Sequence, residues 1–258
     1  MKIEAENLSW AAGPAIIVDG IDVPAMPGRI LGLLGPNGSG KSTLLGMLAR
    51  TIQPRTGVVK LDDRPYSDWA PRDIARVLSV VQQKATTDQD VTVRDVIDLG
   101  RIPHRRRWAG PSPRDREVVE AAACRTGIEH LLNRDWHTLS GGEQQRAHLA
   151  RAFAQEGQVM LLDEPTNHLD ISHQLDILKT LRETGLGVVV ALHDLNLATT
   201  FCDEVLVLHK GRAVCLGRPA DVLTEDLIRE VYGVEVRILH PDGDETPLFQ
   251  FLRPVTQT

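Results

Sequence analysis

Short runs of consecutive apolar residues recur along the chain, and polar or glycine-containing segments follow them directly. Apolar runs of this length are typical of strands that are buried in a parallel sheet. We therefore predict strands over residues 30–34, 77–81, 159–162 and 188–192. Open α/β sheets bind ligands beyond the carboxyl ends of their strands. One site can therefore collect the segments that follow these strands, at Gly35, Gln83, Asp163 and His193.

Other parts of the chain carry patterns that are typical of helices and hairpins. Val93, Val96 and Ile97 follow a helical spacing. Further helices are predicted over residues 43–50, 114–126 and 220–232, and after Ser140. Turn residues separate 205–208 from 213–216, and 234–239 from 248–252, so each pair predicts a hairpin. Residues 1–30 carry short, turn-rich segments that suit an antiparallel β layer.

The composition narrows the class of protein. The chain has 258 residues, of which 42% are hydrophobic and 25% are charged, and this suits one or two globular domains. A formal net charge of −6 argues against a general nucleic-acid binder. No apolar stretch approaches the roughly 20 residues that span a bilayer, and the start of the chain does not fit a signal peptide. We therefore expect a protein that is soluble by itself and made in the cytoplasm.

Two smaller features carry weaker predictions. Cysteines are few and have no metal-binding spacing, so we expect small buried side chains and neither a disulfide nor a ligand set. They are Cys124, Cys202 and Cys215. The basic run Arg105-Arg106-Arg107 predicts a solvated face or loop, with contact to a partner or to lipid headgroups as the alternative.

A phosphate-loop pattern, G-x-x-x-x-G-K-[ST], follows the first predicted core strand. It reads Gly35-Pro36-Asn37-Gly38-Ser39-Gly40-Lys41-Ser42, and Thr43 comes next. Glycines let the backbone curl so that successive N–H groups point into one concavity and bind phosphate oxygens. We expect Lys41 to reach the β- and γ-phosphates and the Ser42 hydroxyl to bind Mg²⁺. The alternative, a glycine turn with an exposed lysine, fits poorly with a strand before the loop and a helix after it.

Two adjacent carboxylates, Asp163 and Glu164, end the strand predicted at residues 159–162. They would repel each other unless something positive lies nearby, and Mg²⁺ bound to ATP is such a partner. We expect Asp163 to hold the metal through water and Glu164 to act as the general base that polarises the attacking water. A solvated acidic turn is the alternative.

Ser140 and Glu143 form an S-x-x-E capping box at the start of a predicted helix. Capping does not explain Gly141-Gly142, because two glycines in a first turn cost helix stability. They leave bare N–H groups at a positive helix end, and such groups bind anions.

The phosphate loop together with Leu139-Ser140-Gly141-Gly142-Glu143 resembles the ATP-binding cassette family, in which two copies close over two ATP molecules to drive a transporter. The resemblance implies that His193 contacts the γ-phosphate, so that Glu164, His193 and Lys41 form the catalytic set. It also implies that a glutamine after residues 77–81 senses Mg²⁺ and the membrane partner. Gln83 is our choice for this role, beside Ser42 and Asp163 as metal ligands, and Gln82 stays open.

One phosphate loop and one signature per chain mean that complete sites need two chains, arranged head to tail about a two-fold axis. The resemblance implies that Ser140, Gly141, Gly142 and Asp170 contact the ATP held by the opposite chain. We therefore expect a homodimer on two integral-membrane permease subunits, served indirectly by a substrate-binding protein. This places the chain at the cytoplasmic face of the inner (plasma) membrane, with no nucleic-acid partner.

The implied fold is α/β, a P-loop nucleotide-binding core with an antiparallel β subdomain and an inserted helical subdomain. We assign the core to residues 1–87 and 156–233 and the helical subdomain with the signature to residues 88–155. Residues 234–258 remain as a short tail with a predicted hairpin.

Several phrases are similar to importers of ferric siderophores, haem and cobalamin. They are Gly100-Arg101-Ile102-Pro103-His104, residues 170–175, residues 193–198 and Gly217-Arg218-Pro219. The predicted function is therefore ATP hydrolysis that powers uptake of a metal chelate. An importer of another small substrate and a soluble non-transport cassette ATPase are the alternatives.

The chain departs from the family at the adenine contact. The position that aligns with the usual aromatic residue is Ala12, and Trp10 lies on the same strand face. Trp10 can either stack on adenine or pack in the core.

Overall fold

The computed structural model describes residues 1–24, 27–82, 90–106, 109–167, 169–240 and 246–255. Its centre is a six-stranded sheet in the order β10-β9-β3-β8-β7-β6, parallel except for β10. The bounds are β3 Ile30–Leu34, β6 Leu78–Val81, β7 Val159–Asp163, β8 Gly187–Ala191, β9 Glu204–His209 and β10 Arg212–Gly217. All residues of β3 and of β8 are buried, which explains their continuous apolar runs. The predicted core strands and the β9–β10 hairpin are thus confirmed.

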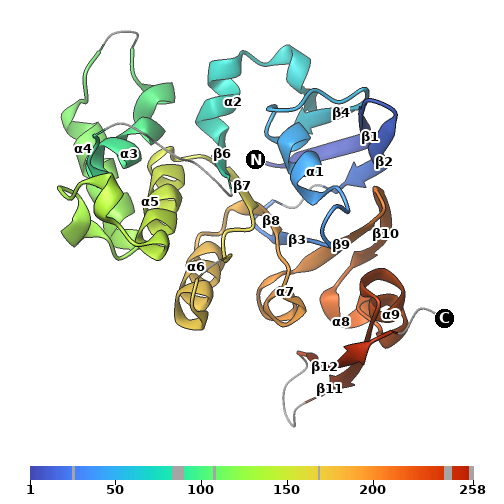
Figure 1. The fold of residues 1–258 in the computed structure, drawn as a ribbon. Coiled ribbons are helices and arrows are strands. Elements are labelled where there is room, and N and C mark those ends of the chain that lie inside the picture. Colours follow the sequence, from blue (N-terminus) through green and yellow to red (C-terminus); the bar gives the residue numbers. More distant parts are fainter. Residues whose placement is uncertain (25–26, 83–89, 107–108, 168, 241–245, 256–258) are drawn as a thin grey trace.

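A second sheet of four antiparallel strands lies beside α1 (Lys41–Leu48), toward the upper right of Figure 1. Its strands are β1 Ile3–Ala12, β2 Ala15–Val23, β4 Thr56–Leu61 and β5 Arg64–Pro65. The first hydrophobic cluster contains Leu44 and Leu48 of α1 together with residues of both sheets, so α1 is fixed from two sides. The predicted antiparallel layer within residues 1–30 is confirmed for β1 and β2.

Some of the remaining helices pack on the main sheet, and others form a separate group beside it. They are α2 Pro71–Val77, α3 Val93–Asp98, α4 Pro113–Arg125, α5 Gly141–Ala154, α6 Ile171–Glu183, α7 Leu195–Phe201, α8 Pro219–Val222 and α9 Glu225–Tyr232. Short 3₁₀ turns are η1 Tyr66–Asp68, η2 Leu99–His104, η3 Glu129–Leu131 and η4 Trp136–Thr138. Residues of α6, α7 and α9 share the second hydrophobic cluster with the sheet.

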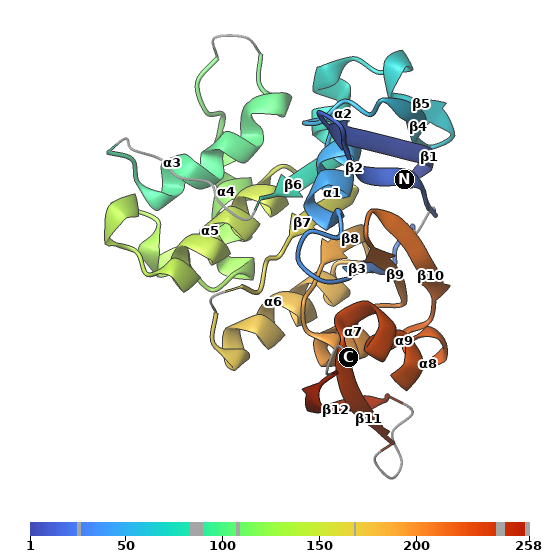
Figure 2. The same ribbon diagram turned by 45° about the vertical axis from the view of Figure 1, so that its right-hand side comes forward.

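The third hydrophobic cluster belongs to α3, α4, α5 and the turns between them. Figures 1 and 2 show these helices on the opposite side of β6 and β7 from α1. Val93, Val96 and Ile97 are buried in this cluster, as their spacing predicts. The subdomain boundaries at residues 87/88 and 155/156 stay a prediction.

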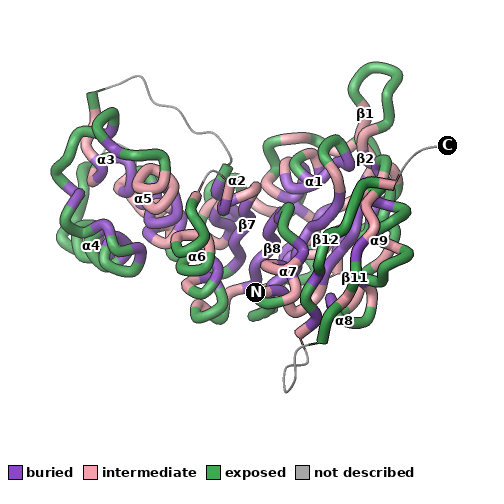
Figure 3. The backbone as a smooth tube through the Cα atoms, turned by 60° about the horizontal axis from the view of Figure 1, so that its bottom comes forward, coloured by how far each residue is buried: buried purple, intermediate pink, exposed green. Residues whose placement is uncertain are grey.

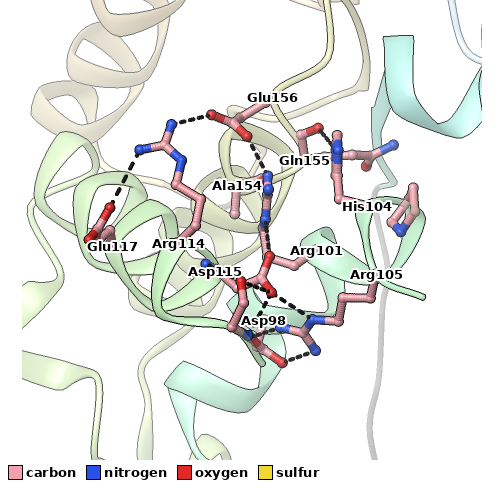
Figure 4. A network of polar contacts seen from close by, with 12 residues as sticks. Asp98, Arg101, His104, Arg105, Arg114, Asp115, Glu117, Ala154, Gln155 and Glu156 are labelled. Atoms are coloured by element: carbon pink, nitrogen blue, oxygen red, sulfur yellow. Dashed lines mark hydrogen bonds and ion pairs between the residues drawn. The ribbon is translucent and has the colours of Figure 1, made fainter. Parts of the chain in front are cut away.

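Buried ion pairs tie this helical group together (Figure 4). The Arg101 guanidinium donates to Asp115 Oδ1 at 2.9 Å, to the Ala154 carbonyl at 2.6 Å and to Glu156 at 2.7 Å. The Arg101 and Asp115 side chains are only 5% and 7% exposed. The network therefore connects η2, the start of α4 and the end of α5.

Arg105 extends the same network, because it pairs with Asp98 and with Asp115. The prediction that residues 105–107 form a solvated face is therefore wrong for Arg105, whose side chain is 14% exposed. Arg106 is exposed, and Arg107 lies outside the described residues.

Three further expectations need correction. The helix predicted at 43–50 begins at Lys41, because the loop ends at Gly40, and it stops before Arg50, whose φ is 60°. The helix predicted at 220–232 is two helices, because Thr224 accepts a hydrogen bond from Leu227 N–H and caps α9. Cys124 is exposed, whereas Cys202 is buried and Cys215 is half-buried.

The chain ends in two strands, β11 Val234–Leu239 and β12 Leu248–Pro254, which pair antiparallel with each other. They correspond to the second predicted hairpin, and residues 241–245 between its strands lie outside the described residues. Among the described helices, none combines the length and apolar character that crossing a bilayer requires.

Candidate functional site

The phosphate loop needs glycine at two positions for steric reasons. Gly35 has φ 138° and Gly40 has φ 104°, in the region that glycine favours. A Cβ on Gly35 would lie 2.1 Å from the Leu208 carbonyl oxygen, and one on Gly40 would lie 2.7 Å from the Ile17 carbonyl oxygen. The backbones of β9 and β2 therefore lie too close to the loop for a side chain at either position.

Lys41 is held inside this loop by backbone carbonyls. Its Nζ donates to the Gly35 carbonyl at 2.7 Å and to the Pro36 carbonyl at 3.1 Å. Burial lowers the pKa of Lys41, while the charges of Glu164 and Asp163 act in the opposite direction. The ammonium therefore lies in a partly desolvated site, where a phosphate would add to the negative charge that favours its ionised form.

Ser42 and Asp163 meet at the point where α1 begins and β7 ends. The Ser42 hydroxyl donates to Asp163 Oδ1 at 3.0 Å. Burial raises the pKa of Asp163, and the neighbouring Glu164 charge acts in the same direction. Two side-chain oxygens from distant parts of the sequence thus face each other, and a nearby cation would favour the ionised Asp163.

Glu164 directly follows β7, has an unusual backbone conformation and makes two side-chain contacts. Its φ is 52°, which is uncommon for a residue with a side chain. Its carboxylate accepts a hydrogen bond from the Asn167 amide at 2.5 Å and contacts His193 Nε2 through the other oxygen. The ends of β7 and β8 are thus linked by the Glu164–His193 contact, as the sheet argument predicts. The sequence did not single out Asn167 as a partner of Glu164.

The two candidate glutamines differ in what the structure describes. Gln83 lies outside the described residues, so its role stays a prediction. Gln82 lines a cavity of about 270 Å³ together with Ser42 and Asp163. The alternative residue Gln82 therefore has access to the space beside the Ser42 and Asp163 side chains.

The signature residues form the helix start that the sequence predicts. Ser140 accepts from Glu143 N–H, and the Glu143 carboxylate accepts from Ser140 N–H at 2.7 Å, so the capping box is confirmed. Gly141 is exposed and Gly142 is half-buried. No hydrogen bond joins residues 140–142 to residues 35–43, both of which are fully described. Within one chain, the signature residues therefore make no hydrogen bond to its own phosphate loop.

Asp170 caps α6 and is exposed. Its Oδ1 accepts from His173 N–H at 3.0 Å, and this bond contributes most to lowering the pKa of Asp170. Trp10 packs against the first hydrophobic cluster, which favours the core-packing alternative, and Ala12 is exposed at the end of β1.

Two residues near the site were missed by the sequence patterns. The Tyr232 hydroxyl is buried near Gly35; burial raises its pKa, and the Gly35 backbone acts against that rise. Asn196, at the start of α7, bonds to the backbone of Phe249 in the tail. Neither contact has a local sequence signal, because each joins segments that are far apart in the chain.

A family model described as ABC transporter matches residues 18–167. The hemin import ATP-binding protein HmuV of Pseudomonas entomophila (strain L48) is 42% identical over 249 residues, covering 93% of this chain and 96% of HmuV. The ferric enterobactin transport ATP-binding protein FepC of Escherichia coli (strain K12) is 38% identical over 251 residues, covering 96% of this chain and 93% of FepC.

The fold is also similar to solved structures of ABC transporter chains. A chain from a transporter described as of the metal-chelate ABC type, in an inward-facing conformation, has a TM-score of 0.84 at 26% identity, and the match covers 100% of this chain and 99% of that chain. The dimeric structure of the bacterial ABC transporter cassette MJ0796 has a TM-score of 0.74 at 26% identity, covering 84% of this chain and 98% of that chain.

Proposed function

Because this chain belongs to the ABC transporter family and is an ATPase of that family, we propose that it powers the import of hemin, a ferric siderophore or a related metal chelate through a separate permease. The observation that carries this proposal is the 42% identity to a hemin import ATP-binding protein over 93% of the chain. The 38% identity to a ferric enterobactin transport ATP-binding protein supports the same class of cargo. Fold alone would not carry it, because one fold hosts many functions.

The geometry of the site supports a different role for each of its residues in ATP hydrolysis. Residues 35–43 would bind the phosphates through backbone N–H groups, and Lys41 would leave its carbonyl partners for the β- and γ-phosphates. Glu164 would take the proton of the attacking water, with Asn167 holding the carboxylate and His193 facing the γ-phosphate. Electrostatic positioning of this kind supplies most of the rate in phosphoryl transfer.

The residues present fit a magnesium ion that arrives with the nucleotide. Ser42 and Asp163 offer a hydroxyl and a carboxylate at 3.0 Å from each other, and oxygen is the ligand that Mg²⁺ prefers. Within the described ranges, no group of three or more His, Cys, Asp or Glu side chains could hold a metal on its own. Ser42 and Asp163, with Gln83 or Gln82, would therefore hold the ion jointly with the phosphates, where it would neutralise their charge.

We also propose a homodimer as the active form. One signature and one phosphate loop per chain, which no hydrogen bond connects within the chain, support sites shared between two copies. Ser140, Gly141, Gly142 and Asp170 would contact the ATP of the opposite chain. The dimer would lie peripherally on two permease subunits at the cytoplasmic face of the membrane, and a substrate-binding protein would deliver the chelate. The division into core, helical subdomain and tail is part of the same proposal.

Uptake in a deletion strain tests the proposal. Strains that lack this gene and carry either the wild-type chain or the Lys41→Ala variant are given iron-labelled hemin, iron-labelled ferric enterobactin and labelled cobalamin. We expect the wild type, and not the variant, to restore accumulation of one of these chelates. If the deletion strain accumulates each of the three chelates as well as the complemented strain does, the import proposal is overturned. ATP hydrolysis by the purified chain tests its enzymatic part separately.

A further inference from the structure

The C-terminal strand β12 is held against α7 by one side chain. Asn196 Oδ1 accepts a hydrogen bond from Phe249 N–H at 2.7 Å, and Asn196 Nδ2 donates to the Phe249 carbonyl at 3.3 Å. A single amide thus satisfies both backbone groups of a strand residue, as a neighbouring strand would. Phe249 is 4% exposed and packs in the second hydrophobic cluster. Figure 3 shows β12 beside α7, with most of its residues exposed.

Glu225 makes a corresponding contact at the other strand of the hairpin. Its Oε1 accepts from Ile238 N–H at 3.0 Å, and Ile238 pairs with Phe249 across the hairpin. At this pair, side chains bind the outward-facing backbone groups of β11 and β12, in place of a third strand. Glu225 belongs to α9 and does not contact α7 through this bond. It therefore offers a matched control for Asn196.

Asn196 also belongs to the segment that carries His193. Asp194 Oδ1 accepts from Asn196 N–H at 2.7 Å at the start of α7. His193 directly precedes Asp194, and its Nε2 contacts Glu164. A continuous series of contacts therefore runs from Phe249 in the tail to the carboxylate that we assign as general base.

We propose that Asn196 is a positioning residue for ATP hydrolysis, which uses β12 as an anchor to fix the His193–Asp194 segment and the His193 ring against Glu164. The inference rests on the proposed function, because it requires Glu164 and His193 to act in hydrolysis. Helix α7 has only 7 residues, so its own hydrogen bonds do little to hold its first turn in place. Residues 35–43, which we expect to make most of the phosphate contacts, lie on other elements, so loss of the anchor should slow the chemical step and leave KM for ATP close to that of the wild type.

The test compares steady-state hydrolysis of Mg²⁺-ATP by the full-length chain and by Asn196→Ala and Glu225→Ala. We expect Asn196→Ala to lower kcat about tenfold with KM for ATP unchanged, because a small misplacement of reacting groups slows reaction without weakening binding. Glu225→Ala should stay within about twofold of wild type. Equal losses in both variants, or an increase in KM alone for Asn196→Ala, would overturn the proposal.

A double-mutant cycle separates positioning from general structural support. In a His193→Ala background, Asn196→Ala should cause no further loss of rate, because its effect passes through His193. Additive losses would contradict the inference. If Asn196→Ala does not fold, Asn196→Asp takes its place in both tests; it keeps the acceptor for Phe249 N–H and loses the donor. Absence of ATP hydrolysis by the wild-type chain would refute the proposed function itself, which is a separate result.

Discussion

The Ser42 hydroxyl donates a hydrogen bond to the Asp163 carboxylate at 3.0 Å, and this bond joins the start of α1 to the end of β7. Both residues are fixed by packed elements, since α1 lies in the first hydrophobic cluster and β7 is an inner strand of the main sheet. The oxygen ligands that we assign to Mg²⁺ are thus brought together by the packing of the fold itself.

The first prediction concerns Asp163→Asn. Burial raises the pKa of Asp163 above 3.8, so the folded state binds the proton more tightly than the unfolded state. The free energy of unfolding therefore falls as pH rises from 3.8 through the pKa of Asp163 in the folded state. The loss of stability from the buried charge persists at neutral pH. The amide keeps an oxygen for Ser42 and carries no charge. We expect a higher melting temperature without nucleotide and at least about a tenfold loss of Mg²⁺-dependent hydrolysis. Thermal unfolding and phosphate release measure both; a lower melting temperature than that of the exposed control Asp176→Asn would contradict the prediction.

Glu164→Gln should separate binding from chemistry. The amide cannot take a proton from water, and general-base catalysis contributes about 10²–10⁴-fold to the rate. We expect ATP binding to be retained, a dimer to accumulate with ATP, and hydrolysis to fall by that factor. Nucleotide titration, gel filtration and phosphate release test these outcomes, with the exposed Glu183→Gln as control. Near-normal turnover in the variant would remove Glu164 from its assigned role.

Gly141→Ala should have opposite effects on stability and activity. A Cβ on Gly141 meets no heavy atom within 4 Å, and alanine in place of glycine stabilises a helix by up to about 1 kcal/mol. The isolated chain should therefore unfold at the same or higher denaturant concentration. The added methyl group would lie where we propose that the opposite chain's phosphate binds, so hydrolysis should fall. Gly110→Ala, which also meets no heavy atom within 4 Å, should change neither quantity. Unchanged hydrolysis in Gly141→Ala would count against the shared site.

Asp115→Asn should destabilise the helical group. Burial acts to raise the pKa of Asp115, but hydrogen bonds from Ser112 and the Arg101 guanidinium outweigh it and hold the pKa below its usual range. Removing one partner of a buried pair costs up to about 3–5 kcal/mol, and the loss should lie at the lower end of this range because Glu156 and the Ala154 carbonyl still bind Arg101. The folded pKa is depressed, so this stabilisation is complete above pH 3.8 and is lost as pH falls further. Denaturant unfolding at neutral and acid pH checks this.

The control for Asp115 is Glu117→Gln, which alters the exposed pair with Arg114. Exposed pairs contribute about 0–1 kcal/mol, so this variant should be close to wild type. Equal stabilities for the two variants at neutral pH would show that the buried network does not hold the helices.

Local patterns predicted the elements whose causes are local. The buried strands were recognised from apolar runs, and the signature helix from the Ser140–Glu143 capping box. Strand β4 was not predicted, because Gly57 and Lys60 interrupt its short apolar run. The split between α8 and α9 depends on the cap at Thr224, which the helical pattern of the flanking residues obscured.

Tertiary contacts account for what sequence reasoning missed. Arg105 looked solvated as part of a basic run, yet Asp98 and Asp115 converge on it from other helices. The Asn196–Phe249 bonds likewise join residues with no shared local motif. The segments at Gly35, Asp163 and His193 could be placed together because a parallel sheet brings strand ends to one edge. The Glu164–Asn167 bond could not be predicted, since it depends on the backbone turn at Glu164.

Helix α5 carries the signature glycines at one end, and at the other Gln155 donates to the carbonyls of Ala75 and Leu78 at 2.6 and 2.8 Å. Its 14 residues form a rod that is about 21 Å long at about 1.5 Å per residue. A tilt of about one degree at the Gln155 end would move the glycine end by roughly 0.4 Å over that length. If α5 turns as a rigid rod about its Gln155 end, beside α2 and β6, a rotation of a few degrees would displace the signature N–H groups from the phosphate that we propose they bind.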